Sequence, residues 1–202
     1  IGSAGAVDPH GGTVLAATEL AAVARLARQH DLLVVTDEVY EHLTFDGAVH
    51  TPIATLPGMA ERTLTISSAG KTLSFTGWKV GWVTGPAALI TAVRTVQQFL
   101  TYVSGAPFQV AVAQALRDED GRTDAWVRGL ADSLAARRDL LCAGLVDAGF
   151  EVVVPGGTYF VVADGAGLGF ADGTELCRRL PELAGVVGVP VTAFCQEGSA
   201  SS

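Results

Sequence analysis

The sequence contains no asparagine at all and only three cysteines among its 202 residues. The cysteines, at positions 142, 177 and 195, are odd in number, and no CxxC or histidine-rich metal spacing occurs. We therefore expect no bound metal and a reducing, cytoplasmic compartment. We assign no role to the four histidines, His10, His30, His42 and His50.

Positive charge is also scarce, since 13 lysines and arginines face 21 aspartates and glutamates, for a net charge of −8. Nucleic acids and anionic membranes both bind basic surfaces, so neither is expected as a partner. No run reaches about 18 uninterrupted apolar residues, and the first residues lack a basic-then-apolar signal pattern. These absences together predict a soluble protein.

What the sequence does contain is an alternation of helical and strand patterns in its first half. Residues 18–30 have helical periodicity with Thr18 as a candidate cap, and residues 32–36 form a continuous apolar run typical of a parallel strand buried on both faces. Two more strands are expected at residues 64–66 and 80–83, and a helix after Gly85 and Pro86. Helix followed by strand indicates an α/β layer architecture.

The second half begins with the charged run at residues 117–124, which we take as a domain boundary. A long helix is expected to residue 148, followed by a hairpin that joins residues 151–154 to 159–162 through Pro155-Gly156-Gly157. A short helix near 175–180 and a strand near 186–191 complete the pattern. We expect two domains: residues 1–120 and a small α+β domain at residues 121–202.

The stretch with the strongest chemical character is residues 65–82, TISSAGKTLSFTGWKVGW. An apolar strand leads into four small residues that deliver Lys71, an amine able to act as a nucleophile. Small residues let the backbone turn sharply and let a ligand come close. A second cation, Lys79, and the hydroxyls of Ser67, Ser68, Ser74 and Thr76 lie in the same stretch.

This stretch, together with LLVVTDEVY at residues 32–40, resembles the cofactor-lysine motif of the fold-type-I, class I/II aminotransferases that use pyridoxal 5'-phosphate. The kynurenine/glutamine and succinyldiaminopimelate aminotransferase branches are the most similar. Asp37 and Lys71 stand 34 residues apart, which suits two side chains that meet at one ligand. The resemblance runs from about Gly12 to Cys195. It implies part of a large cofactor-binding domain, with a mainly parallel sheet and helices on both faces, at residues 1–120, and part of a small C-terminal domain at residues 121–202.

The resemblance also implies a role for each matching residue. Lys71 would form a Schiff base with the cofactor and move the substrate's Cα proton, and Asp37 would keep the pyridine nitrogen protonated. Tyr40 would contact the ring oxygen. Ser68 and Lys79 would bind the phosphate; Ser67 is a weaker candidate. The implied reaction moves an amino group from an amino acid to a 2-oxo acid in a homodimer, with kynurenine, glutamine, methionine or succinyldiaminopimelate open as donor.

The sequence departs from the family pattern at both ends. The family's Asn-Pro-x-Gly element, whose Asn donates to the ring oxygen, corresponds here to Asp8 and its neighbours, and an ionised aspartate cannot donate. No arginine follows Arg179, although the family binds the substrate carboxylate with an arginine beyond this point. We therefore expect these 202 residues alone to be inactive, and a non-catalytic fragment of such an enzyme is the alternative.

A remoter alternative is a nucleotide triphosphatase, since Gly70-Lys71-Thr72 follows a strand as a P-loop does. The P-loop requires a glycine five residues before Gly70, and Thr65 occupies that position.

Overall fold

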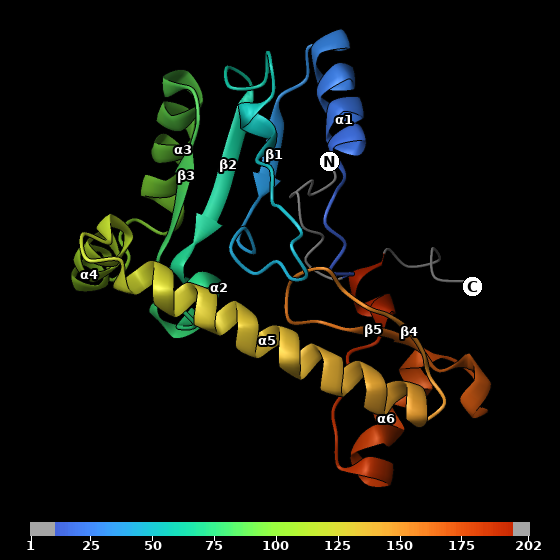
Figure 1. Cartoon of the computed structure of the whole chain (residues 1–202). Coiled ribbons are helices and arrows are strands. Elements are labelled where there is room, and N and C mark those ends of the chain that lie inside the picture. The colour runs from blue at the N-terminus through green and yellow to red at the C-terminus, as the bar shows by residue number, and fades with distance from the viewer. Residues whose placement is uncertain (1–10, 196–202) are drawn as a thin grey trace. The chain divides into compact units, whose positions relative to one another are not determined.

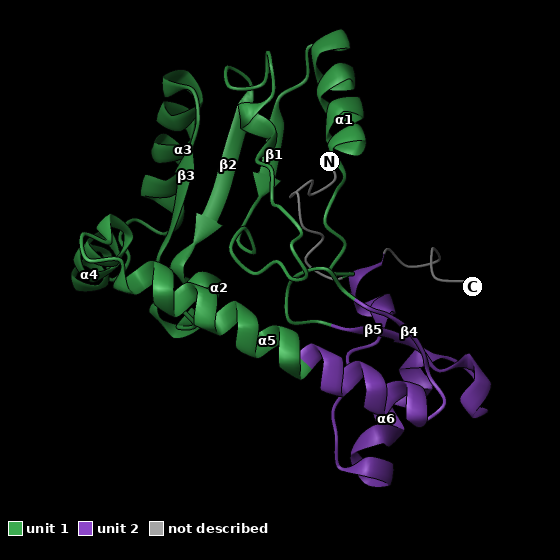
Figure 2. Ribbon diagram, viewed as in Figure 1, with its two compact units in different colours: residues 1–137, 155–160 green, residues 138–154, 161–202 purple. Residues whose placement is uncertain are grey.

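A computed structural model describes residues 11–195 of the chain (Figure 1). The chain divides into two compact units (Figure 2): unit 1 comprises residues 1–137 and 155–160, and unit 2 comprises residues 138–154 and 161–202. The long helix α5, Arg122–Asp147, contributes to both units. The assignment of residues 1–120 and 121–202 to a large and a small domain stays a prediction. Of the helices in residues 11–195, none combines the length and the apolar character that crossing a bilayer requires.

Unit 1 contains a three-stranded sheet in the order β1-β2-β3. Strand β1, Val34–Asp37, runs parallel to β2, Thr63–Ser68, and β2 runs antiparallel to β3, Gly81–Thr84. The three strands expected in the first half are thereby confirmed. Burial on both faces of the first strand is not seen: Thr36 is fully buried on one face, whereas Val35 on the other keeps 43% of its surface exposed.

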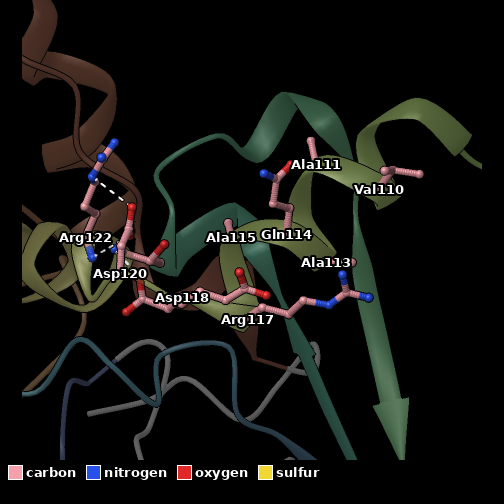
Figure 3. A pocket seen from close by; sticks show the side chains of 11 residues that line it. Val110, Ala111, Ala113, Gln114, Ala115, Arg117, Asp118, Asp120 and Arg122 are labelled. Carbon is pink, nitrogen blue, oxygen red and sulfur yellow. Dashed lines mark hydrogen bonds and ion pairs between the residues drawn. The ribbon is translucent and has the colours of Figure 1, made fainter.

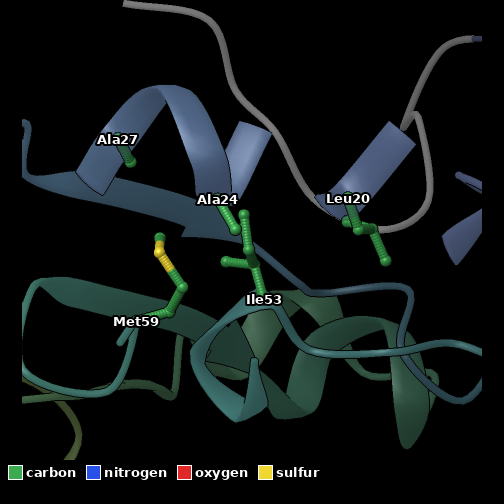
Figure 4. Packing of buried hydrophobic residues seen from close by; sticks show 5 residues of the cluster. All are labelled: Leu20, Ala24, Ala27, Ile53 and Met59. Atoms are coloured by element: carbon green, nitrogen blue, oxygen red, sulfur yellow. The ribbon is translucent and has the colours of Figure 1, made fainter. Parts of the chain in front are cut away.

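One of the hydrophobic clusters of unit 1 lies between the first helix and the segment before β2. Helix α1, Ala17–Gln29, presents a buried face, as its periodicity predicted. Its cluster partners come from the segment before β2, and Figure 4 shows the buried residues of this cluster, Leu20, Ala24, Ala27, Ile53 and Met59. Each large apolar side chain buried there contributes about 1.5–3 kcal/mol. Thr18 as the helix cap is wrong, because the Glu19 carboxylate accepts the Ala16 N–H at 2.7 Å and the helix begins earlier.

The remaining elements of unit 1 are short helices around the sheet and two longer ones after it. They are η1 (Ile53–Thr55), α2 (Ala69–Thr72), η2 (Thr76–Trp78), α3 (Ala87–Leu100) and α4 (Ala106–Arg117). Helix α3 starts directly after Pro86, as expected.

Unit 2 contains the end of α5, a two-stranded antiparallel sheet and helix α6, Gly173–Ala184. Strand β4, Glu151–Val153, pairs antiparallel with β5, Val162–Asp164. A pair of strands was expected here, but the second strand begins at Val162, and its predicted position at residues 159–162 is wrong. Helix α6 is capped by Asp172, whose carboxylate accepts the Glu175 N–H at 2.7 Å. Two short helices complete the unit, η3 (Ala166–Leu168) and η4 (Val191–Phe194). The strand expected at residues 186–191 is wrong, since residues 186–190 are irregular in the described structure.

The connection between β4 and β5 is longer than the predicted turn. Within it, residues Pro155–Phe160 belong to unit 1, and we call this segment the crossing segment. Its backbone is bonded to unit 1 by Gly156 N–H to Gly12 O at 3.0 Å, Phe45 N–H to Gly156 O at 2.8 Å, and Thr158 N–H to Leu43 O at 2.9 Å. Tyr159 therefore lies in the crossing segment and not in a strand.

Candidate active site

The candidate site lies where β1 and β2 end. These strands are parallel, with Asp37 opposite Ile66, so their carboxyl ends meet at one edge of the sheet. Asp37 is the last residue of β1, and Lys71 lies in α2, three residues beyond the end of β2. Figure 1 shows α2 at the arrowhead end of β2. The local sequence explains this placement: Gly70 has no side chain, and a Cβ there would lie 3.2 Å from the Thr76 backbone.

The Lys71 amine lies among phenols. Its Nζ donates a hydrogen bond to the Tyr159 hydroxyl. The same nitrogen is 4.8 Å from the centroid of the Tyr159 ring and 5.6 Å from that of Tyr40, both within cation–π range. The two rings meet edge to face, with centroids 5.5 Å apart at 75°. Lys71, Tyr40 and Tyr159 thus lie together, and the cofactor roles of Lys71 and Tyr40 stay predictions.

The surroundings shift the pKa values of the two phenols, Tyr40 and Tyr159, in opposite directions. Burial, followed by its hydrogen bond to Tyr159 and the nearby Asp37 charge, raises the pKa of Tyr40 far above its ordinary value. Burial would also raise the pKa of Tyr159, but its hydrogen bonds with Lys71 and Tyr40 and the Lys71 charge lower it overall. Tyr40 is therefore the phenol that keeps its proton and donates, whereas the Tyr159 oxygen accepts.

Asp37 lies at the rim of this group. Its side chain is exposed, and its Oδ1 accepts the Val39 N–H at 3.2 Å, closing the turn that leads to Tyr40. An exposed carboxylate has room for a further donor from a ligand.

The candidate phosphate residues, Ser68 and Lys79, come from neighbouring strand ends. Ser68 pairs with Gly81 across β2 and β3, which puts Lys79 at the same end of the sheet. Lys79 is exposed and has a left-handed backbone, with φ 55° and ψ 41°. In the described residues the two side chains make no hydrogen bond with each other. Ser67, the weaker candidate, is buried, and its hydroxyl donates to Glu41 Oε1 at 2.7 Å. This hydroxyl proton is therefore already used within the protein.

Sequence reasoning missed a buried polar pair beneath the site. Glu38 Oε2 and His50 Nε2 are 2.8 Å apart, with side chains 1% and 7% exposed. Thr36 Oγ1 donates to the other Glu38 oxygen at 2.9 Å. His50 therefore makes a buried contact that its place in the sequence did not indicate, since its partner Glu38 lies 12 positions away. Ligand atoms of Glu38, Glu41 and His50 also lie within 4.8 Å of one another, but the 2.8 Å contact is that of a hydrogen bond.

A separate hollow of about 900 Å³ lies along α4 and the loop before α5 (Figure 3). None of the predicted site residues lines it. Asp118 there accepts the N–H groups of Thr123 and Asp124, which lowers its pKa, and Asp120 pairs with Arg122 at 2.9 Å. These contacts stabilise the start of α5, and this explains why the polar side chains are there. We therefore assign no ligand to the hollow. Asp8, the substitute for the family's asparagine, lies outside the described residues.

Fold and site together define an α/β protein with a lysine at the carboxyl ends of parallel strands. Its family follows from comparison with known proteins: the chain belongs to the aminotransferase class I and II family, whose model matches residues 10–199. The resemblance of residues 32–40 and 65–82 to this family is confirmed.

Individual relatives agree with this assignment. The chain is 57% identical over 190 residues, 93% of its length, to a probable N-succinyldiaminopimelate aminotransferase of Mycobacterium tuberculosis, of which it covers 47%. It is 40% identical to the mouse (Mus musculus) kynurenine–oxoglutarate transaminase 3, covering 95% of this chain and 45% of that protein. The solved structure of the M. tuberculosis enzyme superposes with a TM-score of 0.89 at 56% identity, over 95% of this chain and 49% of that one.

These comparisons confirm the predicted fold class, that of the type I aminotransferases. The chain spans about half the length of the relatives that it matches.

Proposed function

We propose that this chain is the lysine-bearing part of a pyridoxal-phosphate-dependent aminotransferase, which moves an amino group from an amino acid to a 2-oxo acid. The observation that carries the proposal is the position of the Lys71 amine. It lies at the shared carboxyl ends of β1 and β2, against Tyr40, while Asp37 ends the adjacent strand.

The residues present fit the polar groups of this cofactor. Its aldehyde needs an amine, which Lys71 supplies, and its ring nitrogen needs a carboxylate, for which Asp37 is exposed. Its ring oxygen needs a donor, and Tyr40 is the phenol that keeps its proton. Its phosphate needs hydroxyls and a cation, which Ser68 and Lys79 offer at one end of the sheet.

Each residue then has a defined task. Lys71 would hold the cofactor through its carbonyl carbon, and its free amine would take and return the proton at the substrate's Cα. Asp37 would hold a proton on the ring nitrogen, and Tyr40 would donate to the ring oxygen. The bound cofactor supplies an electron-withdrawing ring that stabilises negative charge at Cα. Ser68 and Lys79 hold the phosphate with charge-assisted hydrogen bonds.

The donor stays open among kynurenine, glutamine, methionine and succinyldiaminopimelate. The higher identity to the M. tuberculosis relative makes N-succinyldiaminopimelate the first candidate to assay. A homodimer and a cytoplasmic location stay predictions. Family membership removes the triphosphatase alternative. The non-catalytic fragment remains a second candidate, because the chain spans only about half the length of its relatives.

The composition of the chain makes the test sharp, since Lys71 and Lys79 are its only two lysines. The chain is incubated with pyridoxal phosphate, reduced with borohydride, digested and examined by mass spectrometry. We expect the phosphopyridoxyl group on Lys71 and no label in Lys71→Ala, whereas Lys79→Ala keeps the label at saturating cofactor. A label on Lys79, or equal labelling of both lysines, would show that Lys71 is not the reacting amine.

A further inference from the structure

We propose that Tyr159 is a positioning residue that holds the free amine of Lys71 and, with Tyr40, sets the direction from which this amine meets a carbonyl carbon. The inference rests on the proposed function in one respect, that Lys71 is the reacting amine. It adds a residue from the crossing segment, 88 positions further along the chain.

The first support is the geometry around Nζ. A lysine amine on its four-carbon stem has many accessible positions, and fixing one of them costs side-chain entropy. Here the Tyr159 hydroxyl accepts a hydrogen bond from Nζ, and the rings of Tyr40 and Tyr159 lie 5.6 Å and 4.8 Å from it. The amine is therefore held by three contacts from two segments that are far apart in sequence.

The second support is the way in which Tyr159 itself is held. Its neighbour Thr158 is fully buried and has φ 66°, a left-handed conformation that is strained for a β-branched residue. This backbone persists because Leu43 accepts the Thr158 N–H and because the Thr158 hydroxyl accepts the Phe160 N–H at 3.1 Å. Gly12 allows its own segment to pack closely against the crossing segment, since a Cβ at position 12 would lie 2.3 Å from the Pro155 side chain.

The third support is exposure. Tyr159 keeps 44% of its surface exposed although its backbone is fixed so tightly. A tyrosine that served only the core would be buried. The rigid backbone instead presents the ring and hydroxyl at the rim, where the amine lies.

The charges around Tyr159 agree with this role. The ionisable groups that face it in the described residues are Lys71 and Tyr40, with Asp37 acting on Tyr40. Two donors converge on the Tyr159 oxygen, and its pKa is lowered in spite of burial. The oxygen can thus accept a hydrogen bond from the amine whenever the amine is not attached to a carbonyl carbon.

The first experiment needs no cofactor. The chain is trace-labelled with acetic anhydride at fixed pH, and the ratio of acetylation at Lys71 to that at Lys79, the internal reference, is read by mass spectrometry. Tyr159→Phe keeps the ring and removes the oxygen, so we expect the ratio to rise about tenfold, the factor for one hydrogen bond to a charged group. Tyr102→Phe, at an exposed tyrosine, is the matched control and leaves the ratio unchanged. An unchanged ratio in Tyr159→Phe would overturn the proposal.

A second measurement guards against a variant that merely loosens the fold. In a Tyr102→Phe background only Tyr40 and Tyr159 titrate as tyrosines, because the chain has three. The first tyrosinate absorbance step should disappear in Tyr159→Phe. Lys71→Ala should move this step to higher pH, since the lysine lowers the pKa of Tyr159, and Lys79→Ala should leave it in place. If the first absorbance step stayed at the same pH in Lys71→Ala, the contact between Lys71 and Tyr159 would be contradicted.

The two proposals fail in different ways. If borohydride fixes the cofactor to Lys71 but neither the labelling ratio nor the titration responds, Tyr159 has no positioning role and the proposed function stands. If the cofactor is fixed elsewhere while the titration still responds to Lys71→Ala, the contact is real and the proposed function is wrong.

Discussion

Replacing His50 with alanine should destabilise the chain by about 2–4 kcal/mol, because it removes a partner from a buried carboxylate. The Glu38 side chain is 1% exposed and lies 2.8 Å from His50 Nε2. Losing a hydrogen bond to a charged group costs about 1.5–3 kcal/mol, and breaking a buried pair costs about 3–5 kcal/mol. Thr36 still donates to the other Glu38 oxygen, which places the expected value between these limits.

The control is His42→Ala. Its imidazole is 52% exposed and 3.8 Å from Glu41, so its loss should change the free energy of unfolding by less than about 0.5 kcal/mol. Both variants are unfolded in urea and followed by tryptophan fluorescence, with stability read from the midpoint at constant slope. A double-mutant cycle with Glu38→Gln then isolates the pair, since its two single effects should not add.

Equal stability of His50→Ala and His42→Ala would refute the reasoning, as would additive effects in the cycle. Glu38 stands between Asp37 and Tyr40 in the sequence, and its N–H donates to Ile66 O at 2.7 Å. The pair therefore supports the turn from which both candidate cofactor residues project, and the same substitution should weaken cofactor binding.

Two further predictions concern the cofactor and turnover. Lys79→Ala should weaken pyridoxal phosphate binding by about 1–3 kcal/mol, measured by fluorescence titration, and unchanged affinity would remove Lys79 from the phosphate site. The 202 residues alone should show no amino-group transfer to a 2-oxo acid in a coupled assay with a full-length relative as control, because they span about half the length of the relatives that they match. Multiple turnovers would show that these residues are sufficient to hold and convert the substrate.

The sequence by itself determined the fold class and predicted the residues at the centre of the candidate site. Asp37 and Lys71 could be predicted because one ends an apolar strand and the other follows the next strand by three residues, and parallel neighbouring strands end at the same edge of a sheet. The buried face of α1 could also be predicted from the sequence, since helical periodicity is a local property. Thr18 was misjudged as a cap because the Glu19 side chain selects an earlier start, and two neighbouring caps are difficult to rank from residue types alone.

Only the tertiary structure decided what surrounds Lys71. The Pro155-Gly156-Gly157 pattern indicated a tight turn, but the backbone there bonds to Gly12, Leu43 and Phe45, and those partners leave no local signal in the sequence. Tyr159 reaches Lys71 through that segment, and His50 contacts Glu38, which lies 12 positions before it in the sequence. Such contacts depend on hydrogen bonds between distant segments, which compensate for strain at Thr158 and burial at Glu38. Periodicity and propensity describe neighbours along the chain, and so they carry no information about either contact.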